Sequence, residues 1–268
     1  MNRRPGNRYL LPLLLAALTL QALPAGAATV LTYGYEVQQK LPHPRENFVQ
    51  GLQIVGDTLY VGTGQYGESR LREYAFPEMT LRREVALPDT LFGEGVTRLD
   101  RQLYQLTWRA GVLLIYDARS LELKRSHRID TQGWGITHNG SELIYSDGSD
   151  RLYFLDPDTL ERRRTLAVHL NGQPLPRLNE LEWIDGEIWA NVWGANQLVR
   201  IDPESGEVRG IVDLRGLLEP GERTADTDVL NGIAWDPEKR ELWVTGKRWP
   251  WLFRIRPVAL PADGRGRD

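Results

Sequence analysis

The sequence has no cysteine and only four histidines. The missing cysteines exclude disulfide bonds, cysteine-ligated zinc and thiol nucleophiles, so burial of the core alone must stabilise the fold. Four histidines offer little material for a histidine-rich metal site. An excess of charge is missing too, because 33 lysines and arginines nearly balance 36 aspartates and glutamates and leave a net charge of −3. We therefore expect neither nucleic acid nor an anionic membrane surface as a partner.

The apolar run near the N-terminus is too short to favour a membrane-spanning helix. Residues 3–8 contain three arginines, Leu10–Leu20 is apolar, and Ala25–Ala27 matches a small-x-small cleavage site. This pattern predicts a signal peptide over residues 1–27 and an exported chain, periplasmic or secreted, over residues 28–268. A membrane anchor is the alternative. The sequence has no lipobox cysteine and no further long apolar stretch. We therefore expect no membrane anchor.

A pattern that recurs five times along the chain sets the expected architecture. The first residues of successive copies are 44, 40, 45 and 52 residues apart, which is the length of a propeller blade. Each copy opens with a similar triplet, and turns and further β-rich runs follow it. The five triplets are Gln50-Gly51-Leu52, Glu94-Gly95-Val96, Trp134-Gly135-Ile136, Asn179-Glu180-Leu181 and Asn231-Gly232-Ile233.

Short strands in groups of four, with no useful helix-period segment, predict an all-β, five-bladed β-propeller that forms a single domain over residues 28–268. The fifth copy supplies only three strands and ends with Leu252–Arg256. The segment Tyr35–Pro42 resembles the outer strand Leu81–Pro88 of the first copy. We therefore expect the N-terminal strand to join the last blade, which closes the ring and covers an open edge.

Corresponding positions of the five copies should converge on one axis, because the innermost strands of a propeller line its central channel. The first triplet positions then form one ring: Gln50, Glu94, Trp134, Asn179 and Asn231. A second ring, 14 or 16 positions further along each copy, contains Trp108, Trp193 and Lys247, with Gly64 and Gly148 at equivalent places. Polar groups that converge inside an aromatic wall are typical of a small-ligand pocket.

Simpler roles stay open for several of these residues. Gln50, Asn179 and Asn231 can equally satisfy backbone groups at strand ends. Glu94 differs, because a carboxylate among aromatic side chains is desolvated, which raises its pKa and suits it to proton exchange near neutral pH. Its alternative role is a structural salt bridge with Lys247. Three further acids are expected in turns or loops rather than in catalysis: Asp147, Asp226 and Asp228.

Nine short strings along the chain form a recognisable series. They are Phe48–Leu52, Gly62–Ser69, Phe92–Val96, Leu106–Trp108, Gly133–Thr137, Leu178–Glu182, Ala190–Trp193, Leu230–Ala234 and Thr245–Lys247. In content and order the series resembles the motifs of the plant-type glutaminyl-peptide cyclotransferases. The resemblance covers about Tyr33–Pro257, and one small departure is Val49, where the family usually has threonine.

The resemblance implies a five-bladed propeller that converts the N-terminal glutamine of peptides or proteins to pyroglutamate and releases ammonia. It implies an active site with catalytic Glu94, Lys247 and Asn179 and with substrate-binding Phe48, Gln50, Phe92, Trp108, Trp134 and Trp193. It implies no cofactor for the chemistry and no catalytic metal, although the family's channel can hold a structural cation, often calcium. We expect a monomer whose partners are peptides or proteins with N-terminal glutamine.

The reaction assigns roles to these residues, because its nucleophilic amine is already tethered to the carbonyl that it attacks. We expect the aromatic side chains to fold the substrate into the attacking conformation. Glu94 should take the proton from the α-amine and later give one to the leaving nitrogen. Lys247 and Asn179 are suited to polarising the γ-carbonyl, and Gln50 to orienting the substrate amide.

Two other functions remain open at this stage. A calcium-dependent propeller lactonase or hydrolase would use Glu94, Asn179 and Asn231 as ligands of a catalytic cation. A non-catalytic periplasmic propeller would present its loops to peptides. Ammonia release from a glutaminyl peptide separates all three.

Overall fold

The fold is described here from a computed structural model, which covers residue 1 and residues 30–261. These residues form 22 strands and one short 3-10 helix, η1 (Pro220–Glu222), so the expected all-β class is confirmed. No helix within them is long and apolar enough to cross a membrane. The predicted signal peptide, residues 1–27, lies outside the described residues except for Met1.

Three separate four-stranded sheets follow one another along the chain, and each is an antiparallel meander. The first comprises β2 (Val49–Val55), β3 (Thr58–Thr63), β4 (Arg70–Ala75) and β5 (Thr80–Ala86). The second comprises β6 (Gly93–Leu99), β7 (Gln102–Thr107), β8 (Val112–Asp117) and β9 (Leu123–Arg128). The third comprises β10 (Ile136–His138), β11 (Leu143–Ser146), β12 (Arg151–Leu155) and β13 (Arg162–Ala167).

The remaining long strands form one eight-stranded sheet made of two four-stranded halves. One half comprises β16 (Leu178–Ile184), β17 (Glu187–Val192), β18 (Gln197–Ile201) and β19 (Val208–Asp213). The other comprises β20 (Leu230–Asp236), β21 (Glu241–Gly246), β22 (Trp251–Ala259) and β1 (Leu31–Pro42). A small hairpin, β14 (His169–Leu170) with β15 (Gln173–Pro174), was not expected from the sequence.

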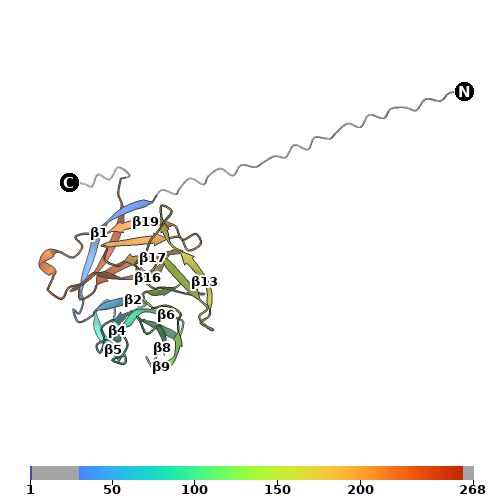
Figure 1. The fold of residues 1–268 in the computed structure, drawn as a ribbon. Coiled ribbons are helices and arrows are strands. Elements are labelled where there is room, and N and C mark those ends of the chain that lie inside the picture. The colour runs from blue at the N-terminus through green and yellow to red at the C-terminus, as the bar shows by residue number, and fades with distance from the viewer. Residues whose placement is uncertain (2–29, 262–268) are drawn as a thin grey trace.

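The N-terminal strand β1 joins the two halves of this sheet. It pairs antiparallel with β22 from Tyr33 to Pro42, which confirms the expected pairing of the N-terminal strand with the last one. Its beginning also pairs in parallel with β19, and Figure 1 shows blue β1 beside orange β19. Because β1 covers the outer edge of β22, the first and last described segments of the chain hold each other in place.

The first strands of the five four-stranded units contact one another in a closed cycle: β2 contacts β6, β6 contacts β10, β10 contacts β16, β16 contacts β20, and β20 contacts β2. Apolar residues of each unit pack against the neighbouring unit, as Phe154 and Leu181 do in one buried cluster. Two pockets lie at the two ends of this ring of first strands.

The middle triplet positions explain how the five first strands approach so closely. Four of the five hold glycine, and a Cβ on Gly51 would lie 2.3 Å from the backbone nitrogen of Val96. The fourth unit has Glu180 instead, and its side chain is fully buried. Its carboxylate accepts backbone N–H groups from Leu52 on β2 and Ile233 on β20, so this one side chain fills the axis that the glycines leave open.

Candidate active site

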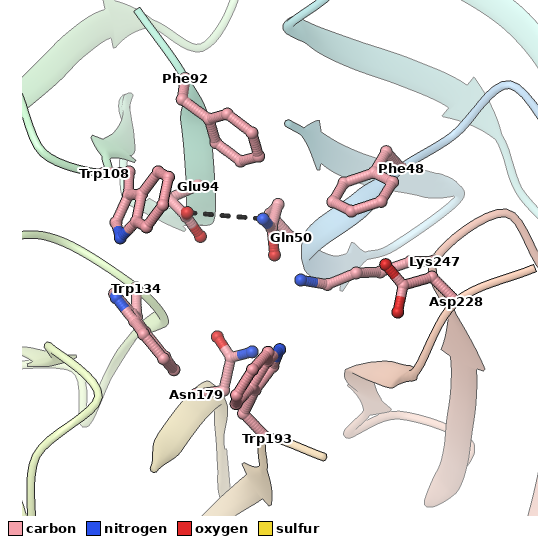
Figure 2. A pocket seen from close by; sticks show the side chains of 10 residues that line it. All are labelled: Phe48, Gln50, Phe92, Glu94, Trp108, Trp134, Asn179, Trp193, Asp228 and Lys247. Atoms are coloured by element: carbon pink, nitrogen blue, oxygen red, sulfur yellow. Dashed lines mark hydrogen bonds between the residues drawn. The ribbon is translucent and has the colours of Figure 1, made fainter. Parts of the chain in front are cut away.

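A cavity of about 360 Å³ opens at the end of the ring where the first strands begin. Figure 2 shows its lining side chains, which come from all five units. They are Phe48, Gln50, Phe92, Glu94, Trp108, Trp134, Asn179, Trp193, Asp228 and Lys247. The structure thus brings together every predicted site residue and adds Asp228, which we had expected to be an ordinary loop residue.

Irregular backbone pairing directs the first triplet residues into this cavity. The register shifts at the same place in β2, β6, β16 and β20, between Val49 and Gly51 in β2 and at matching points in the others. A β-bulge inserts an unpaired residue and re-aims its side chain. The residues at these four register shifts include Gln50, Glu94, Asn179 and Asn231. The same β-bulge-like irregularity therefore positions a polar side chain in four of the five copies.

Glu94 is the acid of the pocket. Its side chain is only 4% exposed, and its Oε1 accepts a hydrogen bond of 3.4 Å from Nε2 of Gln50. Burial raises the pKa of Glu94 well above its usual range, while the charge of Lys247 works in the opposite direction. Within residues 30–261 no cation lies within ion-pair distance of Glu94, so the geometry does not support the alternative of a Glu94–Lys247 salt bridge.

Lys247 faces Glu94 across the cavity, as Figure 2 shows. Burial lowers the pKa of Lys247, and the charges of Glu94 and Asp228 raise it. Its Nζ lies 4.9 Å from the centre of the Phe48 ring, where the aromatic face stabilises a cation. Asp228 lies beside the lysine stem and is exposed. The sequence held one signal for it, since Phe48 and Phe92 also reach the pocket from positions just before their triplets.

The aromatic wall consists of rings in edge-to-face contact, a preferred arrangement of aromatic pairs. Phe92 lies 6.2 Å from Phe48 and 5.5 Å from Trp108, and Trp134 lies 6.1 Å from Trp193, between ring centres. Two glycines make room for these rings. A Cβ on Gly64 would be 2.3 Å from Phe92, and one on Gly148 would be 2.6 Å from Trp134. In the second predicted ring, tryptophans therefore alternate with glycines. The glycines leave room for the aromatic rings of Phe92 and Trp134.

Two buried polar atoms of the lining have no hydrogen-bond partner in the described part of the chain: Oδ1 of Asn179 and Nε1 of Trp134. Unpaired buried polar groups are costly and rare in native structures, and one explanation is a missing ligand. An acceptor and a donor in one small cavity can bind the amine, amide or carbonyl groups of a glutaminyl residue.

Asn231 does not line the cavity, although the sequence placed it in the same ring. It is fully buried, and its Nδ2 donates to the backbone carbonyl of Val49 at 3.1 Å and to Oε1 of Gln50 at 3.3 Å. Its expected alternative role, satisfying a backbone group, is thus confirmed. The second bond also orients the amide of Gln50, whose nitrogen then points to Glu94.

Two further acids, Glu180 and Glu182, lie deeper along β16 and are buried. Burial raises the pKa of both, that of Glu182 to about 8, and the charge of Glu182 raises the pKa of Glu180 further. Each already accepts backbone N–H groups, Glu182 from Trp235 at 2.9 Å. Among the described residues no three histidine, cysteine, aspartate or glutamate side chains form a metal-ligand cluster.

Comparisons with known proteins agree with this geometry. A family model described as glutamine cyclotransferase matches residues 10–257. A curated glutaminyl-peptide cyclotransferase from Arabidopsis thaliana is 40% identical over 227 residues, which cover 82% of this chain and 70% of the relative. A crystal structure of glutaminyl cyclase from Myxococcus xanthus superposes with a TM-score of 0.80 at 30% identity and covers 87% of this chain and all of that one.

Proposed function

The chain belongs to the glutamine cyclotransferase family, and from this premise we propose how its pocket converts an N-terminal glutamine to pyroglutamate. The family match, the plant relative and the structural neighbour make the chain an enzyme, a glutaminyl-peptide cyclotransferase. The observation that carries the proposed mechanism is Glu94, the one acid buried in the cavity, with free acceptor capacity and a raised pKa.

Glu94 acts as the general base and then as the general acid. The α-amine attacks the γ-carbonyl, so a bond forms between the amine nitrogen and the carbonyl carbon while Glu94 accepts a proton from the nitrogen. The bond from that carbon to the side-chain nitrogen then breaks, and Glu94 returns the proton to the leaving nitrogen, which departs as ammonia. A raised pKa suits both steps, because proton transfer is efficient when the pKa lies near the operating pH.

The other polar groups stabilise charge and hold geometry. Burial lowers the pKa of Lys247 and the charges of Glu94 and Asp228 oppose that shift, and in its ammonium form the side chain is placed to stabilise the oxyanion that develops on the γ-carbonyl. Asn179 lines the cavity, and its amide nitrogen is suited to donate to the γ-carbonyl of the substrate. Gln50 orients Glu94, and Asn231 holds Gln50.

The aromatic side chains supply the folded conformation of the substrate. A cavity of about 360 Å³ walled by Phe48, Phe92 and three tryptophans is large enough for a glutaminyl residue. Confinement of the side chain brings the tethered amine to its own γ-carbonyl, so part of the entropy of ring closure is lost on binding. Water excluded from the same wall strengthens the charge interactions inside.

The architecture that fits this site is a five-bladed β-propeller in a single domain over residues 28–268. The proposal is supported by the five four-stranded units, by the closed cycle of first strands and by β1, which completes the last unit. We also infer that residues 1–27 direct export to the periplasm or the medium, because they combine a basic start, an apolar run and a cleavage site.

A structural cation, which the family resemblance implies, would be held by Glu180 and Glu182. The two carboxylates are buried side by side on β16, and neither forms an ion pair within residues 30–261, so a cation fits their charge. Such a cation would neutralise charge inside the ring, and the chemistry at Glu94 would not use it.

The direct test is to incubate the purified protein with a dipeptide that begins with glutamine. Ammonia should appear in step with a product that has lost the mass of ammonia. The same peptide with an acetylated α-amine is the matched control, because it keeps the amide but has no free nucleophile. Release of ammonia from the acetylated peptide would indicate an amidase, and release from neither would contradict the proposed function.

A further inference from the structure

The mouth of the pocket carries two arginines that the mechanism does not use. Arg109 follows Trp108 directly, and its guanidinium carbon lies 4.1 Å from the centre of the Trp108 ring. Arg177 lies over Trp193 at 5.9 Å, and its carbonyl accepts the backbone N–H of Trp193 at 2.8 Å. Both arginines are exposed, and Trp193 is itself 43% exposed. They are therefore the charged neighbours of two rings that form the cavity wall.

Arg109 lies just after β7 of the second unit, and Arg177 lies just before β16 of the fourth. Figure 2 shows Trp134 between Trp108 and Trp193 in the wall of the cavity. Arg177 is held in place by its backbone, which has a left-handed φ of 68° and donates its N–H to Gly148 at 2.9 Å. A non-glycine residue in this conformation is uncommon and needs support from its surroundings, which here fix where its side chain starts.

Within the described residues, no acid neutralises the positive charge of either arginine. Within residues 30–261 neither arginine forms an ion pair or a side-chain hydrogen bond. Among the acids in loops at this end of the ring, Glu68 pairs with Arg248 at 3.6 Å and Asp147 accepts the hydroxyl of Tyr153 at 2.9 Å, whereas Asp228 forms no ion pair within the described residues. No described acid comes within ion-pair distance of Arg109 or Arg177. Two guanidinium groups thus keep their donors free beside the route into the site.

We propose that Arg109 and Arg177 form a subsite that binds an acidic side chain just after the N-terminal glutamine, so that the substrates are peptides with aspartate or glutamate at the second or third position. This rests on the proposed function, because the glutamine fills the cavity and the rest of the peptide must leave through its mouth. A guanidinium that lies over an indole can keep N–H groups free for a carboxylate.

The size of the effect follows from exposure. Exposed ion pairs are weak and screened by salt, and a carboxylate that passes two unpaired arginines can pair with either of them. We expect roughly a fivefold to tenfold preference for glutamate over alanine at the second position at low salt, with lysine disfavoured below alanine. The preference should appear in kcat/KM through KM, because the contact forms on binding and lies away from the reacting atoms.

The experiment compares three peptides, Gln-Glu-Ala, Gln-Ala-Ala and Gln-Lys-Ala, each amidated at the C-terminus, by ammonia release at low and high salt. The wild-type enzyme is measured beside Arg109→Gln, Arg177→Gln and the double variant. Arg240→Gln is the matched control, because Arg240 also lies over an indole, Trp235 at 5.5 Å, but at the other end of the ring. Thermal unfolding shows that each variant is folded.

The expected result is the order glutamate, alanine, lysine in the wild type, flattened by salt and by the double variant but kept by Arg240→Gln. Equal kcat/KM for the three peptides, or a preference that survives the double variant, would overturn the subsite. Should the arginine variants fail to fold, the wild-type order and its salt dependence still decide. Ammonia from none of the peptides would instead contradict the proposed function.

Discussion

Two buried glutamates, Glu94 and Glu180, occupy neighbouring rings of the same molecule and have different surroundings. Burial raises the pKa of both. Glu94 accepts one long hydrogen bond, 3.4 Å from Gln50, and opens on a cavity. Glu180 accepts backbone N–H groups at 3.2 and 2.8 Å and fills the axis of the ring. A raised pKa therefore does not separate a reactive acid from a structural one, whereas free acceptor capacity beside a cavity does.

The rings themselves differ in the same way. Four of the five first triplet positions lie at backbone bulges, the five hold four kinds of side chain, and all but Asn231 line the pocket. The middle positions hold four glycines and Glu180, packed so closely that a Cβ would collide with the neighbouring strand. One position of the repeat is free to vary because a cavity lies beside it, and the next is fixed by contact between strands.

The sharpest way to test this contrast is Glu94→Gln. The amide keeps the shape and can still accept from Gln50, but it cannot exchange a proton at neutral pH. We expect kcat to fall by roughly 100-fold or more while thermal unfolding stays close to that of the wild type. Both are measured on the same preparation, with ammonia release from a glutaminyl dipeptide. Near-normal turnover in a folded variant would remove Glu94 from the mechanism.

Glu180→Ala should show the opposite pattern. It leaves two buried N–H groups without an acceptor and opens a cavity on the axis, at a cost of about 2–4 kcal/mol in the free energy of unfolding. Denaturant unfolding measures the loss, and Glu180→Gln, which retains one acceptor, should lie between the variant and the wild type. A stable Glu180→Ala protein without activity would mean that the deeper ring takes part in the chemistry.

A smaller effect is expected from Asn231→Ala, which acts on Glu94 through Gln50. The N–H that Gln50 donates stabilises the ionised carboxylate, so losing its orientation should raise the pKa of Glu94 further. Because the base form is needed, activity falls as the pH drops through this pKa, and the acid limb of kcat/KM should shift to higher pH. We expect roughly a tenfold loss below neutral pH, which shrinks as the pH rises.

The matched control for Asn231 is Asn191, another fully buried amide, which accepts the N–H of Gly232 at 2.9 Å and does not contact Gln50. Asn191→Ala should lower stability and leave the pH profile in place. In a Gln50→Ala background, Asn231→Ala should cost little more, since its partner is already gone. Additive losses would show that Asn231 works only through the backbone carbonyl of Val49.

The sequence was most informative where the repeat fixes a strand end. The repeat placed seven of the ten lining residues, because five copies of one backbone bring equivalent positions to one axis, and the family resemblance added Phe48 and Phe92. Asp228 was missed because it lies in the irregular segment between β19 and β20, before the triplet with which its copy of the repeat opens. The separate role of Glu180 was also missed. Its fit into the space of four glycines becomes visible only when the ring is closed.

Of these changes, removal of divalent cations should affect turnover least. It tests whether the ring of middle triplet positions, which contains Glu180, has a purely structural role. A cation held by Glu180 and Glu182 would lie in the structural ring, where it offsets the repulsion between two buried carboxylates. Prolonged treatment with a strong chelator should therefore leave kcat within about twofold, because the proton transfers use a side chain.

Thermal unfolding of the same chelated sample provides the second measurement. A bound cation stabilises only the folded chain, so its removal should lower the midpoint of unfolding, and added calcium should restore it. Glu182→Gln should remove that response by weakening the site. If chelation instead abolishes turnover in a chain that stays folded, and metal restores it, the reaction depends on a cation. Glu94 would then be a ligand of the metal. Its assignment as the reactive acid, in contrast to the structural Glu180, would be wrong.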